Sequence, residues 1–416
     1  MIAAEAGNLR IDARRYWDSL MEMAKIGATP KGGCNRQTLT DLDRQGRDLF
    51  RRWCEAAGCT VAVDEMGNMM ALRPGRRPDL PPVAIGSHLD TQPTGGKFDG
   101  VAGVLAGLEI VRTLAENGYE TDHPILVVNW TNEEGTRFAP AMLASGVFAG
   151  AFTKEWAYAR TDREGKRFGD ELERIGYKGT LPCTPQHWKC HLELHIEQGP
   201  ILEAEGKTIG VVTGAQGIRW YEVRITGKES HAGSTPMPRR KDALVAAARA
   251  IEALDALARA HGPHAVATVG VLEIAKPSRN VVPGEVFFTI DLRHPDDAVL
   301  TELDRAVQRI VAEACARDGL AHTVDPIWHF PSVRFDPTCV AAIRAAAEAG
   351  GFSWREMVSG PGHDSCYTAR VVPTAMIFVP CRDGLSHNEE EWAEPEHLAA
   401  GCQVLLQAAL ALARAD

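Results

Sequence analysis

The sequence lacks the features expected of a membrane, secreted or nucleic-acid-binding protein. No stretch approaches roughly 18 uninterrupted apolar residues, so we expect no membrane-spanning helix. Residues 1–17 mix acidic and basic side chains where a signal peptide needs an apolar core, which favours a cytoplasmic protein. A net charge of −10 argues against a nucleic-acid or anionic-membrane partner, since either would select a basic face. We therefore expect small-molecule chemistry.

The ten cysteines form no recognisable disulfide framework or zinc site. They are scattered along the chain, and no two of them stand in a CxxC pair. Scattered cysteines are typical of reduced thiols, which agrees with the expected cytoplasmic location.

Short apolar segments alternate with helical patterns near the beginning and the end of the chain. Residues 82–87 and 124–130 have the composition of buried strands, and residues 99–117 have helical apolar spacing between them. The last quarter of the chain repeats this rhythm over residues 339–349, 373–379 and 395–414. This alternation predicts an α/β domain with a mostly parallel central sheet flanked by helices.

The middle of the chain follows a different order of elements. A strand, a helix, two strands, a helix and a strand predict the βαββαβ unit of a ferredoxin-like domain. The Gly-rich residues 211–217 and the Pro-bearing residues 326–332 flank this unit and are natural hinges. We therefore expect an inserted domain at residues 215–329, between the two parts of the α/β domain at 1–214 and 330–416.

Metal-competent side chains stand at or after the ends of predicted strands, and they are His88, Asp90, Asp99, Glu133, Glu134, His195 and His387. Ligand sites of an open parallel sheet gather beyond the carboxyl ends of its strands, so we expect these loops to converge. Their imidazoles and carboxylates suit Zn²⁺ and are also acceptable to Mn²⁺, Co²⁺ or Ni²⁺. Asp99 can bridge two ions, the adjacent glutamates can divide the roles of base and ligand, and Asp90 can bond the second nitrogen of His88.

Each of these residues also has an ordinary structural interpretation. Asp99 can cap the helix that follows it, and the two adjacent glutamates can form a solvated charge pair near a turn. His88 and His387 can be loop histidines. His195 lies in a segment that alternates polar and apolar residues, which is typical of a half-exposed strand. No single residue decides between the two interpretations.

Four motifs occur in order along the chain: GSHLDTQPTGGKFDGVAGVLAGLE, TNEEGTRF, HAGSTPM and SHNEEEW. Together they resemble the M20-type metallopeptidase and amidohydrolase superfamily, and the resemblance covers essentially the whole chain. It implies a zinc-exopeptidase-like fold whose inserted domain serves in dimerisation or as a lid. His195 in ELHIEQGP replaces the acidic ligand that is usual in the peptidase branch. That replacement, with GAQGIRW, SRNVVPGEVFFTIDLR and SGPGHDS, resembles the hydantoinase/carbamoylase subgroup.

The resemblance implies two divalent metal ions, one held by His88 and His195, the other by Glu134 and His387, with Asp99 as the bridge. Glu133 is then the general base and acid, supported by Asp90, and the reaction is hydrolysis of a linear amide C–N bond. The subgroup includes N-carbamoyl-L-amino acid hydrolases, beta-ureidopropionase and allantoate amidohydrolase. We expect an N-carbamoyl amino acid to be cleaved to the amino acid, ammonia and carbon dioxide.

The resemblance also implies substrate contacts, which are Gln198, His231, Asn280, Arg293 and Gly362. Arg293 can hold a carboxylate with two parallel hydrogen bonds, although alone it would be interpreted as a surface arginine. His231 is the implied oxyanion donor, in its own subunit or in the partner's site, and its ordinary interpretation is a turn-capping histidine. His363 and Asp364 are interpreted as caps of the following helix and are left out of the site.

Other functions remain open at this stage. An aminoacylase or dipeptidase of the same superfamily would use the same metals on a different substrate, and an allantoate amidohydrolase would use them on a related one. An inactive binding or scaffold homologue would have lost at least one ligand or the base, and every one of these residues is present. We expect a homodimer with twofold symmetry, and the substrate side chain, its stereochemistry and the native metal stay undetermined.

Overall fold

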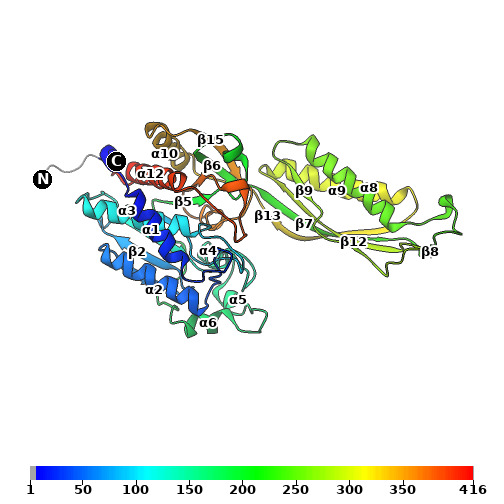
Figure 1. Ribbon diagram of the computed structural model, residues 1–416, viewed down its shortest axis with the longest axis horizontal. Helices are drawn as coiled ribbons and strands as arrows, with labels where there is room; N and C mark the ends of the chain where they lie inside the picture. Colours follow the sequence, from blue (N-terminus) through cyan, green and yellow to red (C-terminus); the bar gives the residue numbers. More distant parts are fainter. Residues whose placement is uncertain (1–5, 416) are drawn as a thin grey trace. The chain divides into compact units, whose positions relative to one another are not determined.

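The computed structural model describes residues 6–415, which divide into two compact units. The α/β unit comprises the described residues up to Thr213 and from Arg334 onward, and the inserted unit comprises Gly214–Val333. Each unit has its own sheet and its own helices (Figure 1). The two units are therefore described separately.

The α/β unit is built on a nine-stranded sheet whose centre is parallel. Its central strands, in the order β4-β3-β5-β16, are β4 (Ile125–Trp130), β3 (Val83–His88), β5 (Cys190–Ile196) and β16 (Thr374–Val379). All residues of these strands are buried, as in parallel sheets covered on both faces. The sheet is extended by β1 (Thr60–Val63), β2 (Met69–Arg73), β6 (Ile209–Ala215), β14 (Val333–Arg334) and β15 (Trp354–Ser359). The predicted α/β class with a mostly parallel central sheet is confirmed.

Helices of the α/β unit pack against this sheet and against one another. They are α1 (Ala13–Ala24), α2 (Asp41–Ala56), α3 (Val101–Glu116), α4 (Leu143–Phe148), α5 (Lys154–Tyr158), α6 (Phe168–Arg174), α7 (Ile201–Ala204), α10 (Pro337–Ala349), α11 (Asp364–Thr368) and α12 (Pro395–Leu412). A Cβ on Gly103 of α3 would lie 2.3 Å from the carbonyl oxygen of Leu194, so this glycine lets α3 approach β5 closely. Helix α1 crosses α3, where the Tyr16 hydroxyl donates to the carbonyl of Ala102 at 2.7 Å. These contacts hold the beginning of α3 against the end of β5.

The expectation that His195 lies in a half-exposed strand is wrong. Strand β5 runs between β3 and β16, and all seven of its residues are buried. The polar side chain of Glu193 in this strand forms hydrogen bonds with other protein groups instead of with water. The Glu193 carboxylate accepts hydrogen bonds from the hydroxyls of Ser87 at 2.7 Å and Ser365 at 2.6 Å. Because buried polar groups need partners and not solvent, the alternating pattern does not distinguish the two cases.

The inserted unit has the predicted βαββαβ order, with the second strand broken in two. Its elements are β7 (Gly217–Thr226), α8 (Ala243–Ala260), β9 (Val266–Thr268), β10 (Leu272–Ile274), β12 (Glu285–His294), α9 (Asp297–Ala316) and β13 (Ala321–Phe330). The sheet order is β10-β12-β7-β13, and β9 also pairs with β12. Asp242 and Asp296 cap the two helices through bonds from backbone N–H groups. A separate two-stranded ladder joins β8 (Ser230–His231) to β11 (Val281–Val282).

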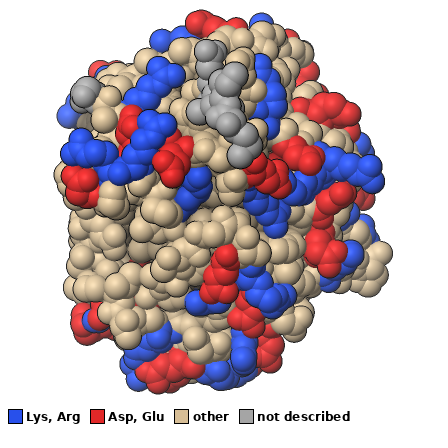
Figure 2. Space-filling model, turned by 90° about the vertical axis from the view of Figure 1, so that its left-hand side faces the viewer, with Lys and Arg blue, Asp and Glu red and all other residues tan. Residues whose placement is uncertain are grey.

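Charged side chains of both signs are interspersed on the face of the molecule that Figure 2 shows. Figure 2 shows Lys and Arg next to Asp and Glu across one face of the molecule, without a continuous patch of one sign. None of the helices in the described part of the chain has both the length and the hydropathy to span a bilayer.

Candidate metal centre

Five predicted metal ligands meet at the carboxyl ends of the central strands. His88 is the last residue of β3, His195 is the penultimate residue of β5, and Glu134 follows β4. Asp99 lies just before α3, and His387 lies in the loop between β16 and α12. The convergence follows from the parallel order of the strands, which places their carboxyl ends at one edge of the sheet.

The five side chains form two groups that share Asp99. In the first group, Asp99 Oδ1 lies 3.4 Å from His88 Nε2 and 3.2 Å from His195 Nε2. In the second group, His387 Nε2 lies 3.3 Å from Asp99 Oδ2 and 3.4 Å from Glu134 Oε2. In each group the three potential ligand atoms lie within 4.8 Å of one another. Asp99 thus turns one oxygen toward each group, as a bridging carboxylate does.

The nitrogen atoms of the first group are arranged to hold a cation. His88 Nδ1 lies 2.9 Å from the carbonyl oxygen of Asp90, and His195 Nδ1 lies 2.9 Å from that of Ile196. These contacts assign an imidazole proton to Nδ1 of each ring, so that each Nε2 is a lone-pair acceptor, which His195 uses toward the N–H of Gly100. His88 Nε2 is buried and has no hydrogen-bond partner. An unpartnered lone pair on His88 Nε2, facing the Asp99 carboxylate in a buried site, fits a divalent metal ion between the two groups.

The charge of the site also fits metal ions. Burial and the neighbouring Asp99 carboxylate raise the pKa of Glu134 to about 7. The same two causes raise the pKa of Glu391 to about 7. Burial lowers the pKa of His88, but the carboxylates of Glu133 and Asp99 outweigh it and raise that pKa well above its ordinary value. The buried carboxylates therefore stabilise positive charge at this position, whether it is a proton or a metal ion.

The interpretation of Asp99 as a helix cap is wrong. Helix α3 begins at Val101, and Gly100 occupies the cap position, where no side chain makes a capping hydrogen bond. Gly100 has a φ of 66°, and a Cβ on it would lie 2.3 Å from His88 Nε2. Its N–H donates to His195 Nε2 at 3.1 Å. The backbone here turns sharply against the two imidazoles, and the Asp99 side chain is free to face them.

Asp90 acts on different groups from those expected. The carbonyl oxygen of Asp90, and not its carboxylate, contacts His88 Nδ1, since the nearest carboxylate oxygen is 3.9 Å away. The Asp90 carboxylate instead accepts hydrogen bonds from the backbone N–H groups of Glu133 at 3.3 Å and Glu134 at 3.2 Å. Asp90 therefore positions the two glutamates and the histidine through different atoms.

Glu133 lies beside the first group and is buried. Its Oε2 lies 3.5 Å from His88 Nε2. Burial raises its pKa well above the ordinary value, and repulsion from Asp364 and Glu134 raises it further against the attraction of His88. A raised pKa favours the protonated form of this carboxyl, so Glu133 is suited to accept a proton, as a general base requires. The glutamates are thus not the solvated pair of the ordinary interpretation.

Gln198 lies at the same centre. Its Nε2 donates to Asp99 Oδ2 at 2.9 Å and to the Ser386 hydroxyl at 3.1 Å. Its Oε1 is buried and has no hydrogen-bond partner, so this oxygen is available to an N–H donor of a ligand. Gly362, in the loop before α11, lies against Met142, whose N–H donates to the Glu133 carbonyl at 2.6 Å.

The other expected substrate contacts lie in the inserted unit, at two separate places. His231 is exposed, and its Nδ1 accepts from the N–H groups of Gly233 and Ser234 at 3.1 and 3.2 Å, which is the turn-capping role. Asn280 lies beside it, because its carbonyl accepts from the N–H of Ala232 at 2.8 Å. Glu285 is the first residue of β12, and this strand begins just after the β8–β11 ladder that contains His231. Arg293 lies eight residues further along β12, a separation of about 26 Å. Arg293 is bonded there to both oxygens of Asp291.

Several residues of the centre were not assigned from sequence. Glu391 is buried, and it accepts from the N–H groups of Phe98 at 3.0 Å and Asp99 at 3.1 Å, so it orients the shared carboxylate. It belongs to the run of three glutamates in the fourth motif, but the sequence does not indicate which of the three turns inward. The segment carrying Glu193 offered no signal beyond its alternating pattern.

The interpretation of His363 and Asp364 as helix caps is also wrong. His363 occupies the cap position of α11, but its side chain makes no capping hydrogen bond. Its ring lies edge-on to that of His195, with centroids 4.5 Å apart. The Asp364 carboxylate accepts from the Ser145 hydroxyl, and its charge contributes to the raised pKa of Glu133. Both residues therefore belong to the surroundings of the centre.

Comparisons with known proteins identify the family and several relatives of this chain. Residues 84–411 match the model of "Peptidase family M20/M25/M40". An N-carbamoyl-L-amino-acid amidohydrolase from Rhizobium meliloti is 55% identical over 409 residues, which is 98% of each chain. One from Paenarthrobacter aurescens is 38% identical, covering 97% of this chain and 99% of the relative. A solved amidase of the hydantoinase/carbamoylase family from Burkholderia multivorans is 58% identical with a TM-score of 0.96, covering 97% of this chain and 98% of its own.

Proposed function

The chain belongs to peptidase family M20/M25/M40, and from that membership we propose that it hydrolyses an N-carbamoyl amino acid to the amino acid, ammonia and carbon dioxide. The arrangement around Asp99, with one oxygen toward each of two ligand groups, is the observation that carries the proposed chemistry. The substrate class is supported by the two amidohydrolases that align with nearly the whole chain. His195, in place of an acidic ligand, supports the same class.

The proposed cofactor is a pair of divalent metal ions in each subunit. His88 and His195 would hold one ion, Glu134 and His387 the other, and Asp99 both. Bound ions would polarise the carbonyl of the substrate and lower the pKa of water. We propose zinc as the native metal from the mixed nitrogen and oxygen ligands, which Mn²⁺, Co²⁺ and Ni²⁺ also accept.

Glu133 is proposed to move the proton of the reaction. Its carboxylate takes a proton from the attacking water and later delivers it to the leaving nitrogen. The raised pKa of Glu133 supports this role, because the protonated carboxyl must persist between the two steps. Asp90 keeps the Glu133 backbone in place through the hydrogen bond at 3.3 Å. The Gln198 Oε1 accepts from the ureido N–H, and the Gly362 N–H donates to the substrate carboxylate.

The inserted unit is proposed to supply His231, Asn280 and Arg293 to substrate binding, and to serve in dimerisation or as a lid. Within one inserted unit, Arg293 lies about 26 Å along the sheet from the end near His231. A single amino acid derivative is too short to contact both ends. The separation supports a homodimer in which His231 and Asn280 of one subunit complete the site of the other. Light scattering in solution tests the dimer.

The cytoplasm is the proposed location. All ten cysteines are buried and none forms a disulfide within the described residues, which suits a reducing compartment.

A substrate panel tests the proposed function. The purified protein is assayed with N-carbamoyl-L-amino acids, N-acetyl amino acids, dipeptides, beta-ureidopropionate and allantoate, each with added Zn²⁺, Mn²⁺, Co²⁺ or Ni²⁺. The proposal expects the highest kcat/KM on an N-carbamoyl-L-amino acid. Faster hydrolysis of acyl or peptide substrates would assign an aminoacylase or dipeptidase instead, and preference for allantoate would assign an allantoate amidohydrolase. A protein that takes up no divalent ion would be a binding homologue without this activity.

A further inference from the structure

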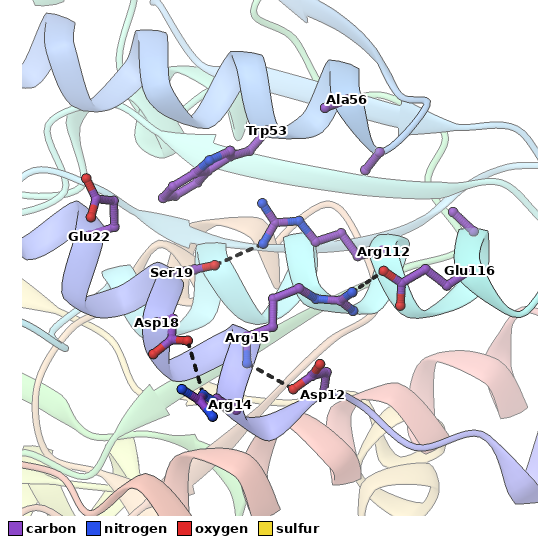
Figure 3. A pocket seen from close by; sticks show the side chains of 12 residues that line it. Asp12, Arg14, Arg15, Asp18, Ser19, Glu22, Trp53, Ala56, Arg112 and Glu116 are labelled. Carbon is purple, nitrogen blue, oxygen red and sulfur yellow. Dashed lines mark hydrogen bonds and ion pairs between the residues drawn. The ribbon is translucent and has the colours of Figure 1, made fainter.

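A pocket of about 570 Å³ lies between α1, α2 and α3 of the α/β unit (Figure 3). It shares no residue with the candidate metal centre. Arg112, which lines it, stands eleven residues beyond Val101 in α3, or about 17 Å along the helix from the end near Asp99. The volume is in the range that holds small ligands.

Arg112 is the chemically distinctive residue of this pocket. Its Nη1 donates to the Ser19 hydroxyl at 2.9 Å, and its guanidinium carbon lies 5.4 Å from the centre of the Trp53 ring (Figure 3). No carboxylate in the described part of the chain forms an ion pair with it. The nearby Glu109 and Glu116 both pair with Arg15 instead. Arg112 is thus a half-buried cation whose remaining N–H donors have no protein acceptor.

A guanidinium in this situation fits a carboxylate from outside the protein. Its planar fork can donate two parallel hydrogen bonds to one carboxylate. Burial of an unpaired charge costs free energy, and a ligand carboxylate would remove that cost. Burial also lowers the pKa of Arg112, and the nearby charge of Glu109 opposes this shift without reversing it.

The other charges of the pocket exclude a polyanion. The lining residues carry four carboxylates, those of Asp12, Asp18, Glu22 and Glu116, against the three guanidiniums of Arg14, Arg15 and Arg112. A phosphate or dicarboxylate would be repelled by this excess of negative charge. A ligand with one carboxylate and one ammonium matches both signs.

Glu22 is placed to receive the ammonium. It stands three residues, or about one turn, beyond Ser19 on α1, so the two side chains lie on the same face of the helix. Ser19 is the residue that accepts the hydrogen bond from Arg112. Its present partner is Lys25, in a solvent-exposed ion pair that contributes little stability. Figure 3 shows Glu22 and Arg112 on opposite sides of the space beneath Trp53. Trp53, Ala56, Ala57 and Ala115 supply the apolar surface of the pocket.

We propose that this pocket binds a free α-amino acid with an apolar side chain. Its carboxylate bonds to Arg112, its ammonium faces Glu22, and its side chain lies against Trp53. The proposal does not depend on the proposed reaction, although an amino acid is the product of that reaction. Binding here is separate from the candidate metal centre.

Isothermal titration calorimetry with L-phenylalanine tests the proposal on the full-length protein. The wild type is compared with Arg112→Gln and with Arg52→Gln, an exposed arginine of α2 that does not line the pocket. We expect Arg112→Gln to weaken binding at least about tenfold, because it removes charge-assisted hydrogen bonds, and Arg52→Gln to leave it unchanged. Arg112→Lys keeps the charge and loses the fork, so it should also weaken binding. It replaces the glutamine variant if that variant does not fold, as judged by circular dichroism.

Two analogues of the ligand test the recognition of each charge. 3-Phenylpropionate lacks the ammonium and phenethylamine lacks the carboxylate, and we expect both to bind at least about tenfold more weakly than L-phenylalanine. The proposal is overturned if L-phenylalanine gives no heat of binding at millimolar concentration. It is also overturned if Arg112→Gln binds like the wild type, which would place the amino acid outside this pocket, or if 3-phenylpropionate binds as tightly as L-phenylalanine. Because the readout is binding, an inactive protein does not affect the result.

Discussion

The two glycines that flank α3 provide a matched test of the candidate metal centre. Gly100 precedes the helix with a φ of 66°, and Gly118 follows it with a φ of 56°. A Cβ on Gly100 would lie 2.3, 2.4 and 2.5 Å from three atoms of the His88 ring, whereas a Cβ on Gly118 would meet nothing within 4 Å. Alanine at either position carries a backbone penalty. Only Gly100→Ala also collides with a proposed metal ligand.

The expected magnitudes follow from these distances. A positive φ at a residue with a side chain costs about 1–3 kcal/mol, so both variants should lose that much stability. Carbon and nitrogen atoms in contact normally lie about 3.5 Å apart or more, so the His88 ring must move by about 1 Å in Gly100→Ala. A displacement of that size costs roughly 100-fold in rate, or about 2.7 kcal/mol of transition-state stabilisation. The displacement should also lower the affinity of the first ligand group for its metal ion.

The measurements are metal content per subunit by mass spectrometry, kcat/KM on an N-carbamoyl-L-amino acid, and the thermal unfolding midpoint. We expect Gly118→Ala to retain two metal ions and wild-type kcat/KM despite a lower unfolding midpoint. We expect Gly100→Ala to lose metal and at least about 100-fold in kcat/KM. Two bound ions and unchanged kcat/KM in Gly100→Ala would refute the assignment of His88 as a ligand at this position.

Three further predictions concern proton transfer, subunit cooperation and acid stability. Glu133→Gln should lower kcat about 10²–10⁴-fold with the metal content unchanged; retained turnover would show that another group is the base. Mixing the inactive Glu133→Gln and His231→Ala subunits should restore about a quarter of wild-type activity if His231 acts across the dimer. Half of random dimers are then mixed, and each mixed dimer has one complete site out of two. No recovery would place His231 in its own subunit's site. Burial lowers the pKa of His191 from 6.5 to about 3. Below pH 6.5 the unfolded chain therefore takes up a proton that the folded chain does not, and the free energy of unfolding decreases as the pH decreases. Between pH 7 and pH 5 the wild type should lose about 2 kcal/mol more unfolding free energy than His191→Gln in denaturant titrations; equal losses would contradict the neutral, buried imidazole.

Several features of this protein were determined by the sequence itself. The alternation of short apolar segments and helical patterns predicts the α/β class, and the βαββαβ order predicts the inserted unit. Such patterns are local, because a helix or strand is specified by residues a few positions apart. The helix caps at Asp242 and Asp296 belong to the same class of information. The ligand residue types in their ordered motifs likewise indicated a metal centre before any geometry.

Other features were decided only by the tertiary structure. The backbone of Asp99 is fixed by a carboxylate 292 residues away in the chain, that of Glu391. The burial of β5 depends on the strands that flank it, and the alternating pattern around His195 is compatible with exposure or burial. Asp90 contacts His88 through its carbonyl because its carboxylate is engaged by the backbone after β4. Sequence patterns specify which chemical groups are present, but the partner of a buried polar group depends on which distant segments pack around it.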